Sequence, residues 1–324
     1  MLRRPQMHPV IGRLGSGDGV QYRASRYRGL RAGSAGTGDH RCCDGMKDWK
    51  GTESNVTFNC IRAVILDWAG TTVDFGILAP VAALGRAFEE SGVPITAAEA
   101  REHMGVLKKD QIRFICAGQR VRGEWTSRYG EAPSERDVER IFGDFLPKQS
   151  EILAEYSAPI PGVPETVEAW RAGGLRIGST TGYTRDLLDV VLPVAARLGF
   201  APDASVTPDE VGGGRPKPFM CYRNAILLGV FPLWHCVKIG DTPADIAEGL
   251  NAGMWTIALS VTGNEIGLSL EDWEALPREE RAAREQSAAR RLMDAGAHFV
   301  APSLAGCTEI LADIERRIAA GEKP

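Results

Sequence analysis

The residue of this chain best placed for chemistry is Asp67, which directly follows the apolar run 63–66. A short uninterrupted apolar run is typical of a buried parallel strand, and Gly70-Thr71-Thr72 after it predicts a turn. Open α/β sheets bind their ligands at the carboxyl ends of such strands. The sequence therefore predicts a reactive or binding carboxylate at Asp67.

Three later segments each place polar residues at a strand or loop end. Alone, each could be a turn aspartate, a capping threonine or a solvated arginine. Together, in this order along the chain, they indicate one site at the carboxyl edge of a sheet. The residues are Thr181 and Gly182 at the end of a strand at 175–181, Arg215 in the loop 214–218, and Asp241 and Asp245 after a strand at 235–240.

The four segments resemble the motifs of the haloacid dehalogenase superfamily, whose aspartate attacks phosphorus or carbon. The resemblance implies that Asp67 is the nucleophile. Thr181, Gly182 and Arg215 would then hold the phosphoryl oxygens. Phosphatases of the superfamily carry a second aspartate two residues later, which protonates the alcohol leaving group. Here that position is Ala69, which implies attack on phosphorus without protonation of an oxygen leaving group.

Four runs narrow the resemblance to the phosphonoacetaldehyde hydrolase family, or phosphonatases, which cleave a carbon–phosphorus bond to give acetaldehyde and phosphate. The similarity covers about residues 60–320. It implies a homodimer, an aspartyl-phosphate intermediate, and a Schiff base between Lys108 and the substrate aldehyde. The runs are Asp67-Trp-Ala-Gly-Thr-Thr-Val-Asp74, Met104-Gly-Val-Leu-Lys108, Gly178-Ser-Thr-Thr-Gly-Tyr-Thr-Arg185 and Gly214-Arg-Pro216.

A lysine at position 108 is consistent with the absence of an acid at Ala69. A bare carbanion is a poor leaving group, whereas a protonated imine lets the electrons of the carbon–phosphorus bond form an enamine. The amine must be neutral when it attacks, so its pKa must lie well below about 10.4. Burial or a neighbouring cation such as Lys109 would lower it. Without the family pattern, Lys108-Lys109 would be an ordinary exposed pair.

The chain departs from the family pattern at Gln111. The family carries a histidine three residues after the Schiff-base lysine, and this histidine relays protons through water. Glutamine can hold a water molecule but cannot accept and return a proton near neutral pH. His103 could substitute, although a solvated or helix-capping histidine is the simpler interpretation. We expect the departure to affect the rate and pH optimum rather than the type of reaction.

An oxygen-only metal site is the second expectation for this sheet edge. Carboxylates with few other ligands suit Mg²⁺, which keeps several waters. We expect its ligands to be Asp67, Asp241 and the backbone carbonyl of Ala69. Asp245 could orient a metal-bound water or pair with Arg215, and it could equally be an acid favoured by the first turn of a helix.

The composition is that of a globular protein, with 324 residues, 44% hydrophobic and 25% charged. The net charge of −4 gives no reason to expect nucleic acid as a partner. No apolar run is long enough for a membrane span. The seven cysteines are scattered without metal-ligand spacing, which favours reduced, packed thiols in a cytosolic protein.

Residues 1–55 differ from the rest because they are basic, rich in glycine and serine, and without apolar periodicity. Such a segment is predicted to be a disordered N-terminal extension. A transit peptide is a second interpretation, and a mis-assigned start with Met46 as the true one is a third.

The remaining chain predicts a doubly wound parallel sheet with an inserted all-helical cap domain, the architecture of haloacid dehalogenase-like proteins. Helical periodicity without strands spans 78–156, the predicted cap, and a capping box at Thr96-Ala-Ala-Glu99 opens one of its helices. Helices and strands alternate from 157 onward, and residues 271–295 are predicted to be charged and helical. The predicted core domain therefore comprises 56–77 and 157–324, and the cap could close over the site and exclude water.

The predicted activity is hydrolysis of the phosphonoacetaldehyde carbon–phosphorus bond in phosphonate degradation. A phosphatase or mutase of the same superfamily is an alternative, although Ala69 argues against both. A 2-haloacid dehalogenase needs neither a second aspartate nor a metal, but it would leave Asp241, Arg215 and the lysine unexplained. A binding or regulatory protein would have no use for the full set of reactive residues.

Overall fold

The computed structural model describes residues 57–324, so the extension predicted for 1–55 lies outside the described residues. Its centre is a six-stranded sheet in the order β3-β2-β1-β4-β5-β6, with every neighbouring pair parallel. The predicted fold class is confirmed. The strands are β1 (Ala63–Leu66), β2 (Arg176–Thr180), β3 (Ala204–Val206), β4 (Cys236–Gly240), β5 (Trp255–Leu259) and β6 (Phe299–Ala301).

Strand β1 lies between β2 and β4, and its register decides which residues meet at the edge of the sheet. Leu66 pairs with Ser179 on one side and with Ile239 on the other. The residues just beyond these partners therefore leave the sheet at the same level. Asp67 continues this ladder, because its backbone N–H donates to the carbonyl of Ile239 at 3.0 Å.

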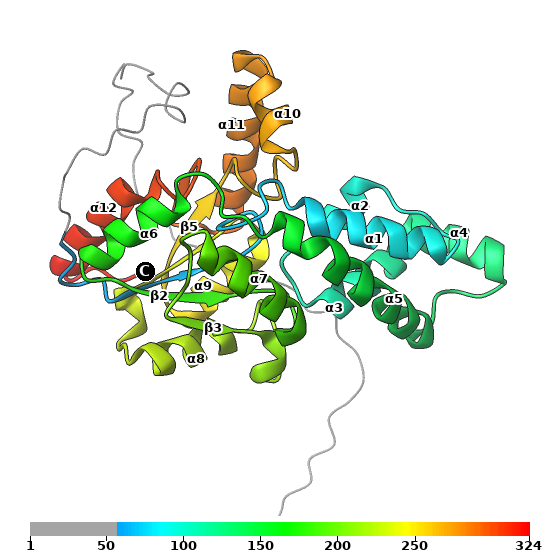
Figure 1. Cartoon of the computed structure of the whole chain (residues 1–324), viewed down its shortest axis with the longest axis horizontal. Coiled ribbons are helices and arrows are strands. Elements are labelled where there is room, and N and C mark those ends of the chain that lie inside the picture. The colour runs from blue at the N-terminus through cyan, green and yellow to red at the C-terminus, as the bar shows by residue number, and fades with distance from the viewer. Residues whose placement is uncertain (1–56) are drawn as a thin grey trace, which may run out of the picture. The chain divides into compact units, whose positions relative to one another are not determined.

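Helices cover both faces of the sheet. Alternate residues of β1 point to opposite faces: Val64 and Leu66 join the core beneath α6, α7 and α12, and Ala63 and Ile65 join the core beneath α8. In Figure 1, α6 and α12 lie above the sheet and α8 below it. These helices are α6 (Val163–Ala172), α7 (Arg185–Arg197), α8 (Phe219–Leu228), α9 (Pro243–Ala252), α10 (Leu270–Ala275), α11 (Arg278–Asp294) and α12 (Cys307–Ala319).

The insertion between β1 and β2 is helical, as the sequence predicts, and has an apolar core of its own that includes Phe88, Ile112, Trp125 and Phe145. Its helices gather at one end of the described structure in Figure 1. The exact division into a core domain (56–77, 157–324) and a cap domain (78–156) stays a prediction. The helices are α1 (Leu78–Glu90), α2 (Ala97–Glu102), α3 (Lys108–Ala117), α4 (Gln119–Tyr129) and α5 (Glu135–Leu153).

The two connecting segments of the insertion run side by side. Val73 and Pro159 form an antiparallel bridge, and the N–H of Ile160 donates to the carbonyl of Thr72 at 2.9 Å. The insertion therefore leaves and rejoins the sheet at one point, next to Asp67.

One helix of the insertion was not predicted from the sequence. Helix α4 was not predicted, because only Val121 and Trp125 of its eleven residues are buried and the apolar period is weak. The helical stretch predicted for 271–295 consists of two helices, since the chain breaks at Leu276-Pro277 between α10 and α11. The capping box of Thr96 and Glu99 is present as predicted.

The described cysteines are free thiols, and Cys116, Cys221, Cys236 and Cys307 are buried. Among residues 57–324, no helix combines the length and apolar content needed to cross a bilayer.

Candidate active site

A small pocket lies between the carboxyl edge of the sheet and the start of α3. It brings together predicted site residues from the helical insertion and from the loops that follow the strands of the sheet. Asp67, Ala69, Met104, Lys108, Thr181, Gly182 and Arg215 all line it, together with Ile77, Pro80, Gly105, Tyr183 and Thr242. Predicted residues more than a hundred positions apart in sequence therefore share one cavity wall.

Asp67 is buried, with 5% of its surface exposed. The guanidinium of Arg215 donates from Nη2 to its Oδ1 at 2.5 Å. Burial raises the pKa of Asp67 to about 6, and the positive charge of Arg215 opposes that rise. The carboxylate is therefore desolvated and available, held from one side by a fixed cation.

Arg215 is the centre of a buried charge cluster. Its Nη2 lies 3.0 Å from Asp245 and donates to the hydroxyl of Thr180 at 2.9 Å. Its Nε donates to Glu248 at 3.0 Å. Nearby charges, above all that of Asp245, keep the pKa of Arg215 well above its usual range despite burial. The guanidinium plane is fixed on three sides.

Two members of this cluster were missed by sequence reasoning. Lys238 lies in the middle of β4 and Glu248 in the middle of α9, and both side chains are fully buried. Lys238 contacts Asp245 at 2.7 Å and Glu248 at 3.6 Å. A signal was available, because a lysine inside the otherwise apolar strand 236–240 requires a buried partner.

Asp67, Asp241 and Asp245 can hold a metal ion, since each offers a carboxylate oxygen within 4.8 Å of the others. Asp241 accepts hydrogen bonds from Thr71 at 3.2 Å and from the N–H of Asn264 at 2.7 Å. No lysine or arginine among the described residues forms an ion pair with it. Burial, then the charges of Asp67 and Asp245, raise its pKa well above the usual range.

The charge balance fits a divalent cation. Among the ion pairs of the described residues, the four carboxylates Asp67, Asp241, Asp245 and Glu248 are offset only by Arg215 and Lys238, two cations for four acids. Lys108 and Arg101 act on the cluster from beyond ion-pair distance. A buried excess charge is strongly unfavourable unless a cation or a proton compensates for it. Asp245 pairs with Arg215 and also forms a capping box with Thr242 at the start of α9. The structure therefore fits both the predicted pairing with Arg215 and the predicted place in the first turn of a helix.

Lys108 is the first residue of α3 and only 3% exposed. Its Nζ donates to Gln111 Oε1 at 3.0 Å and lies 3.3 Å from Met104 Sδ. Burial lowers the pKa of Lys108 to about 8; Asp67 opposes this shift and Arg215 adds to it. The effect comes from burial and not from Lys109, which turns outward and pairs with Glu139.

The Gln111 side chain is fully buried beside this amine, and its Nε2 donates to the carbonyl of Ala100 at 2.7 Å. His103 caps the end of α2 and packs on Phe114, with ring centroids 4.9 Å apart. It forms no hydrogen bond to Lys108, so the simpler interpretation of this histidine fits the structure.

Thr181 and Gly182 follow β2, and Gly182 packs against the backbone of residues 105–106. The Thr181 hydroxyl accepts from the N–H of Tyr183 at 3.0 Å. A Cβ at position 182 would lie 2.7 Å from the carbonyl oxygen of Val106, so this close approach requires glycine. The Tyr183 hydroxyl is buried and finds no partner among the described residues, a feature that sequence reasoning missed although this tyrosine lies in one of its motifs.

Arg101 and Asn264 connect the insertion to the sheet. Arg101 of α2 donates to the carbonyls of Gly76 at 2.8 Å and Gly267 at 3.0 Å. Asn264 donates from its side chain to the carbonyl of Arg101 at 3.1 Å, and from its backbone to Asp241. The position of the insertion is thus linked to an acid of the carboxylate cluster.

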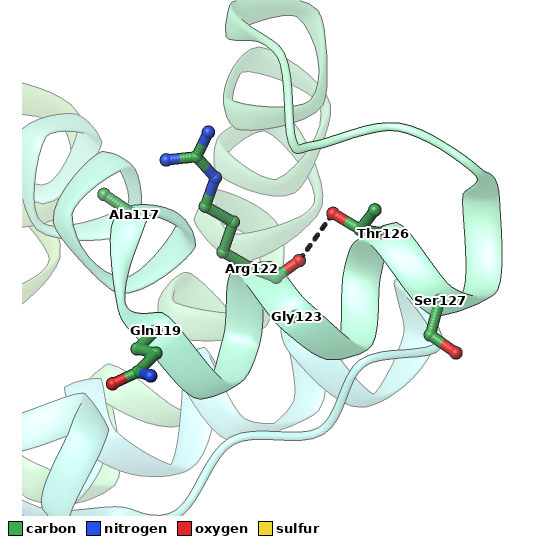
Figure 2. A pocket seen from close by; sticks show the side chains of 6 residues that line it. All are labelled: Ala117, Gln119, Arg122, Gly123, Thr126 and Ser127. Carbon is green, nitrogen blue, oxygen red and sulfur yellow. Dashed lines mark hydrogen bonds between the residues drawn. The ribbon is translucent and has the colours of Figure 1, made fainter.

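A second hollow, of about 620 Å³, lies along α4 (Figure 2). Its walls are Ala117, Gln119, Arg122, Gly123, Thr126 and Ser127, and Thr126 donates back to the carbonyl of Arg122 at 2.8 Å. It contains none of the predicted site residues and no buried acid.

Comparison with known proteins agrees with this geometry. The family model of haloacid dehalogenase-like hydrolases matches residues 61–253. The chain is 45% identical to a phosphonoacetaldehyde hydrolase of Nitratidesulfovibrio vulgaris, over 82% of this chain and 94% of that protein. The chain belongs to the phosphonoacetaldehyde hydrolase family.

The chain is also similar to a solved structure and to a bifunctional relative. A crystal structure of a phosphonoacetaldehyde hydrolase-like protein from Oleispira antarctica matches with a TM-score of 0.81 and 42% identity, covering 84% of this chain and 99% of that one. A bifunctional phosphonoacetaldehyde hydrolase/aminoethylphosphonate transaminase of Clostridioides difficile is 46% identical over 79% of this chain. The chain spans 40% of the length of that bifunctional protein.

Proposed function

We propose that the protein hydrolyses phosphonoacetaldehyde to acetaldehyde and phosphate in phosphonate degradation. The observation that carries the proposal is the buried amine of Lys108, with its pKa lowered to about 8, in one pocket with the carboxylate of Asp67. An amine that is partly neutral near pH 8 can add to an aldehyde. Ala69 in the same wall has no proton for an oxygen leaving group.

The reaction begins at Lys108. Its amine adds to the aldehyde carbon, and loss of water gives a protonated imine. Asp67 then attacks phosphorus; the carbon–phosphorus bond breaks and its electron pair forms an enamine, leaving an aspartyl-phosphate. Protonation of the enamine carbon restores an imine. Two waters then hydrolyse the imine and the acyl phosphate, so that one water is consumed overall and both side chains are regenerated.

Arg215, Thr181 and the N–H of Gly182 would bind the phosphonate oxygens. Arg215 already donates to Asp67, so a phosphonate that reaches the carboxylate also reaches the guanidinium. Glu248 and Thr180 hold this guanidinium in place. The insertion covers the site and excludes water while the enamine exists.

We also propose that the metal is Mg²⁺, held by Asp67, Asp241 and the carbonyl of Ala69, with Asp245 at the side. When bound, it screens the negative charge of the phosphonate and keeps Asp67 ionised. The shortage of cations among the ion pairs of this carboxylate cluster supports the assignment. A homodimer is a further proposal, which rests on the family resemblance.

Reduction with borohydride tests the mechanism. In the presence of acetaldehyde, borohydride should convert the imine to a stable secondary amine that peptide mapping places on Lys108. Lys108→Arg keeps the charge but cannot form the imine, so it should lose phosphate release almost entirely. Lys109→Arg is the matched control and should retain most activity. A label on Lys109, or an active Lys108→Arg protein, would exclude this mechanism.

Asp67→Asn tests the nucleophile separately. It should abolish phosphate release while leaving imine trapping at Lys108 intact, because an amide cannot attack phosphorus. Substantial phosphate release by a folded Asp67→Asn protein would remove Asp67 from this role.

A further inference from the structure

Each N–H bond of a neutral Lys108 amine has an acceptor within reach. A neutral primary amine has two N–H bonds and one lone pair. Two acceptors face Nζ: the amide oxygen of Gln111 at 3.0 Å and the sulfur of Met104 at 3.3 Å. If each takes one N–H bond, the lone pair remains free. Both acceptors are uncharged.

The orientation of the Gln111 amide is itself fixed. Its Nε2 donates to the carbonyl oxygen of Ala100 at 2.7 Å. A flipped amide would place its oxygen against that carbonyl and its NH₂ group against Nζ. The flipped group would donate to the lone pair of Lys108 and occupy the electrons needed for attack. The carbonyl of Ala100 therefore selects the orientation that leaves the amine nucleophilic.

We propose that Gln111 is a positioning residue for imine formation, which holds the Lys108 amine by one N–H bond and leaves its lone pair directed at the substrate aldehyde. This inference rests on the proposed function. A neutral acceptor suits the task, because a carboxylate at the same place would favour the ammonium form of Lys108. Gln111 acts through Lys108 and makes no bond to the reacting atoms.

The charged groups around the amine come from several elements. Asp67 follows β1, Asp74 lies in the connection to α1, Asp241 follows β4, and Arg215 lies in the loop before α8. None of them forms a hydrogen bond or ion pair with Nζ in the described structure. A new charge at position 111 would therefore act on the amine at closer range than any of them.

The test is the rate of reductive trapping of acetaldehyde on Lys108, measured from pH 6 to 10 with the full chain. Gln111→Met keeps the unbranched shape but removes the amide, and it should slow trapping about tenfold, the equivalent of one hydrogen bond. Gln111→Glu should move the pH midpoint of trapping upward. The matched control is Gln149→Met, which alters another fully buried glutamine of the insertion, one without hydrogen-bond partners.

The outcomes separate the two proposals. Slower trapping in folded Gln111→Met, with Gln149→Met unchanged, supports the positioning role, and an upward midpoint in Gln111→Glu supports the placement of position 111 against the amine. A merely structural role for Gln111 would leave the trapping rate of the folded Gln111→Met protein at its wild-type value. Wild-type rate and midpoint in both Gln111 variants would overturn the inference while the imine mechanism stands. Absence of any adduct on Lys108 in the wild-type protein would instead overturn the proposed function.

Discussion

Burial of Lys108 makes it reactive and also opposes folding. Its pKa falls from 10.5 to about 8 in the folded chain, so the unfolded chain binds this proton more tightly. Below pH 8 Lys108 is charged in both states, and the cost of burying its charge lowers the stability of the folded state in full. Between pH 8 and 10.5 the unfolded chain holds more protons, and stability rises with pH.

We therefore expect Lys108→Met to raise the free energy of unfolding at pH 7 by on the order of 1–3 kcal/mol, since a buried charge is replaced by an apolar chain of similar length. The gain should shrink between pH 8 and 10.5, as the wild-type amine loses its proton in both states. Urea unfolding at pH 7 and pH 10 measures this. A variant that is less stable than wild type at pH 7 would contradict the expectation.

The sequence could single out Asp67 and Asp241 because each follows a buried strand, and Arg215 and Lys108 because each lies in a run that resembles the family pattern. It could not identify Glu248 as a partner of Lys238, because a charged residue inside a helix looks the same in sequence whether it is buried or exposed. Their burial against each other follows from strand order and helix packing, which place β4 inside the sheet and α9 over β4 and β5.

At the scale of elements, Arg101 fixes the insertion to the sheet by two backbone carbonyls, those of Gly76 and Gly267. Arg101→Met retains most of the aliphatic stem and removes both bonds. We expect faster amide hydrogen exchange in α2 and at the start of α3, together with a higher KM and a lower kcat, since Lys108 is carried by this region.

Arg120→Met is a suitable control, because Arg120 pairs with Glu99 on the surface of the same insertion. Exposed ion pairs of this kind contribute at most about 1 kcal/mol. Equal exchange rates and kinetics in the two variants would show that Arg101 does not hold the insertion in place.

Strand positions were predicted well from sequence because buried parallel strands are short apolar runs between turns. Helix α4 was not, because its polar composition left only two buried residues to mark it. The apolar core of the insertion forms between helices, and the apolar periodicity of one helix does not predict which other helix packs against it.

At the scale of the whole molecule, the negative charge of the carboxylate cluster should make the thermal stability of the fold depend on metal binding. We expect a chelator to stop phosphate release and Mg²⁺ to raise the melting temperature; a cation at a hundred times its Kd would stabilise by about 2.7 kcal/mol. Asp241→Asn should raise the melting temperature of the chelated protein, because it removes one like charge, and should abolish the rise with Mg²⁺.

Asp294→Asn, at the exposed end of α11, serves as the control and should respond to Mg²⁺ like the wild type. Differential scanning calorimetry with and without chelator provides the comparison. A chelator-insensitive enzyme, or an Asp241→Asn protein with an unchanged Mg²⁺ response, would place the metal elsewhere.

The central position of β1 has a consequence for synthesis of the chain. Ala63 pairs with Arg176 on one side and Cys236 on the other, so this strand has no partners until residues far downstream leave the ribosome. At about 5–20 residues per second, the wait for the first partner strand is roughly 6–23 s. Helices α1 to α5 are complete well before that and share their own core. The part of the chain that carries Lys108 can thus fold first, while the strand that precedes Asp67 remains unpaired.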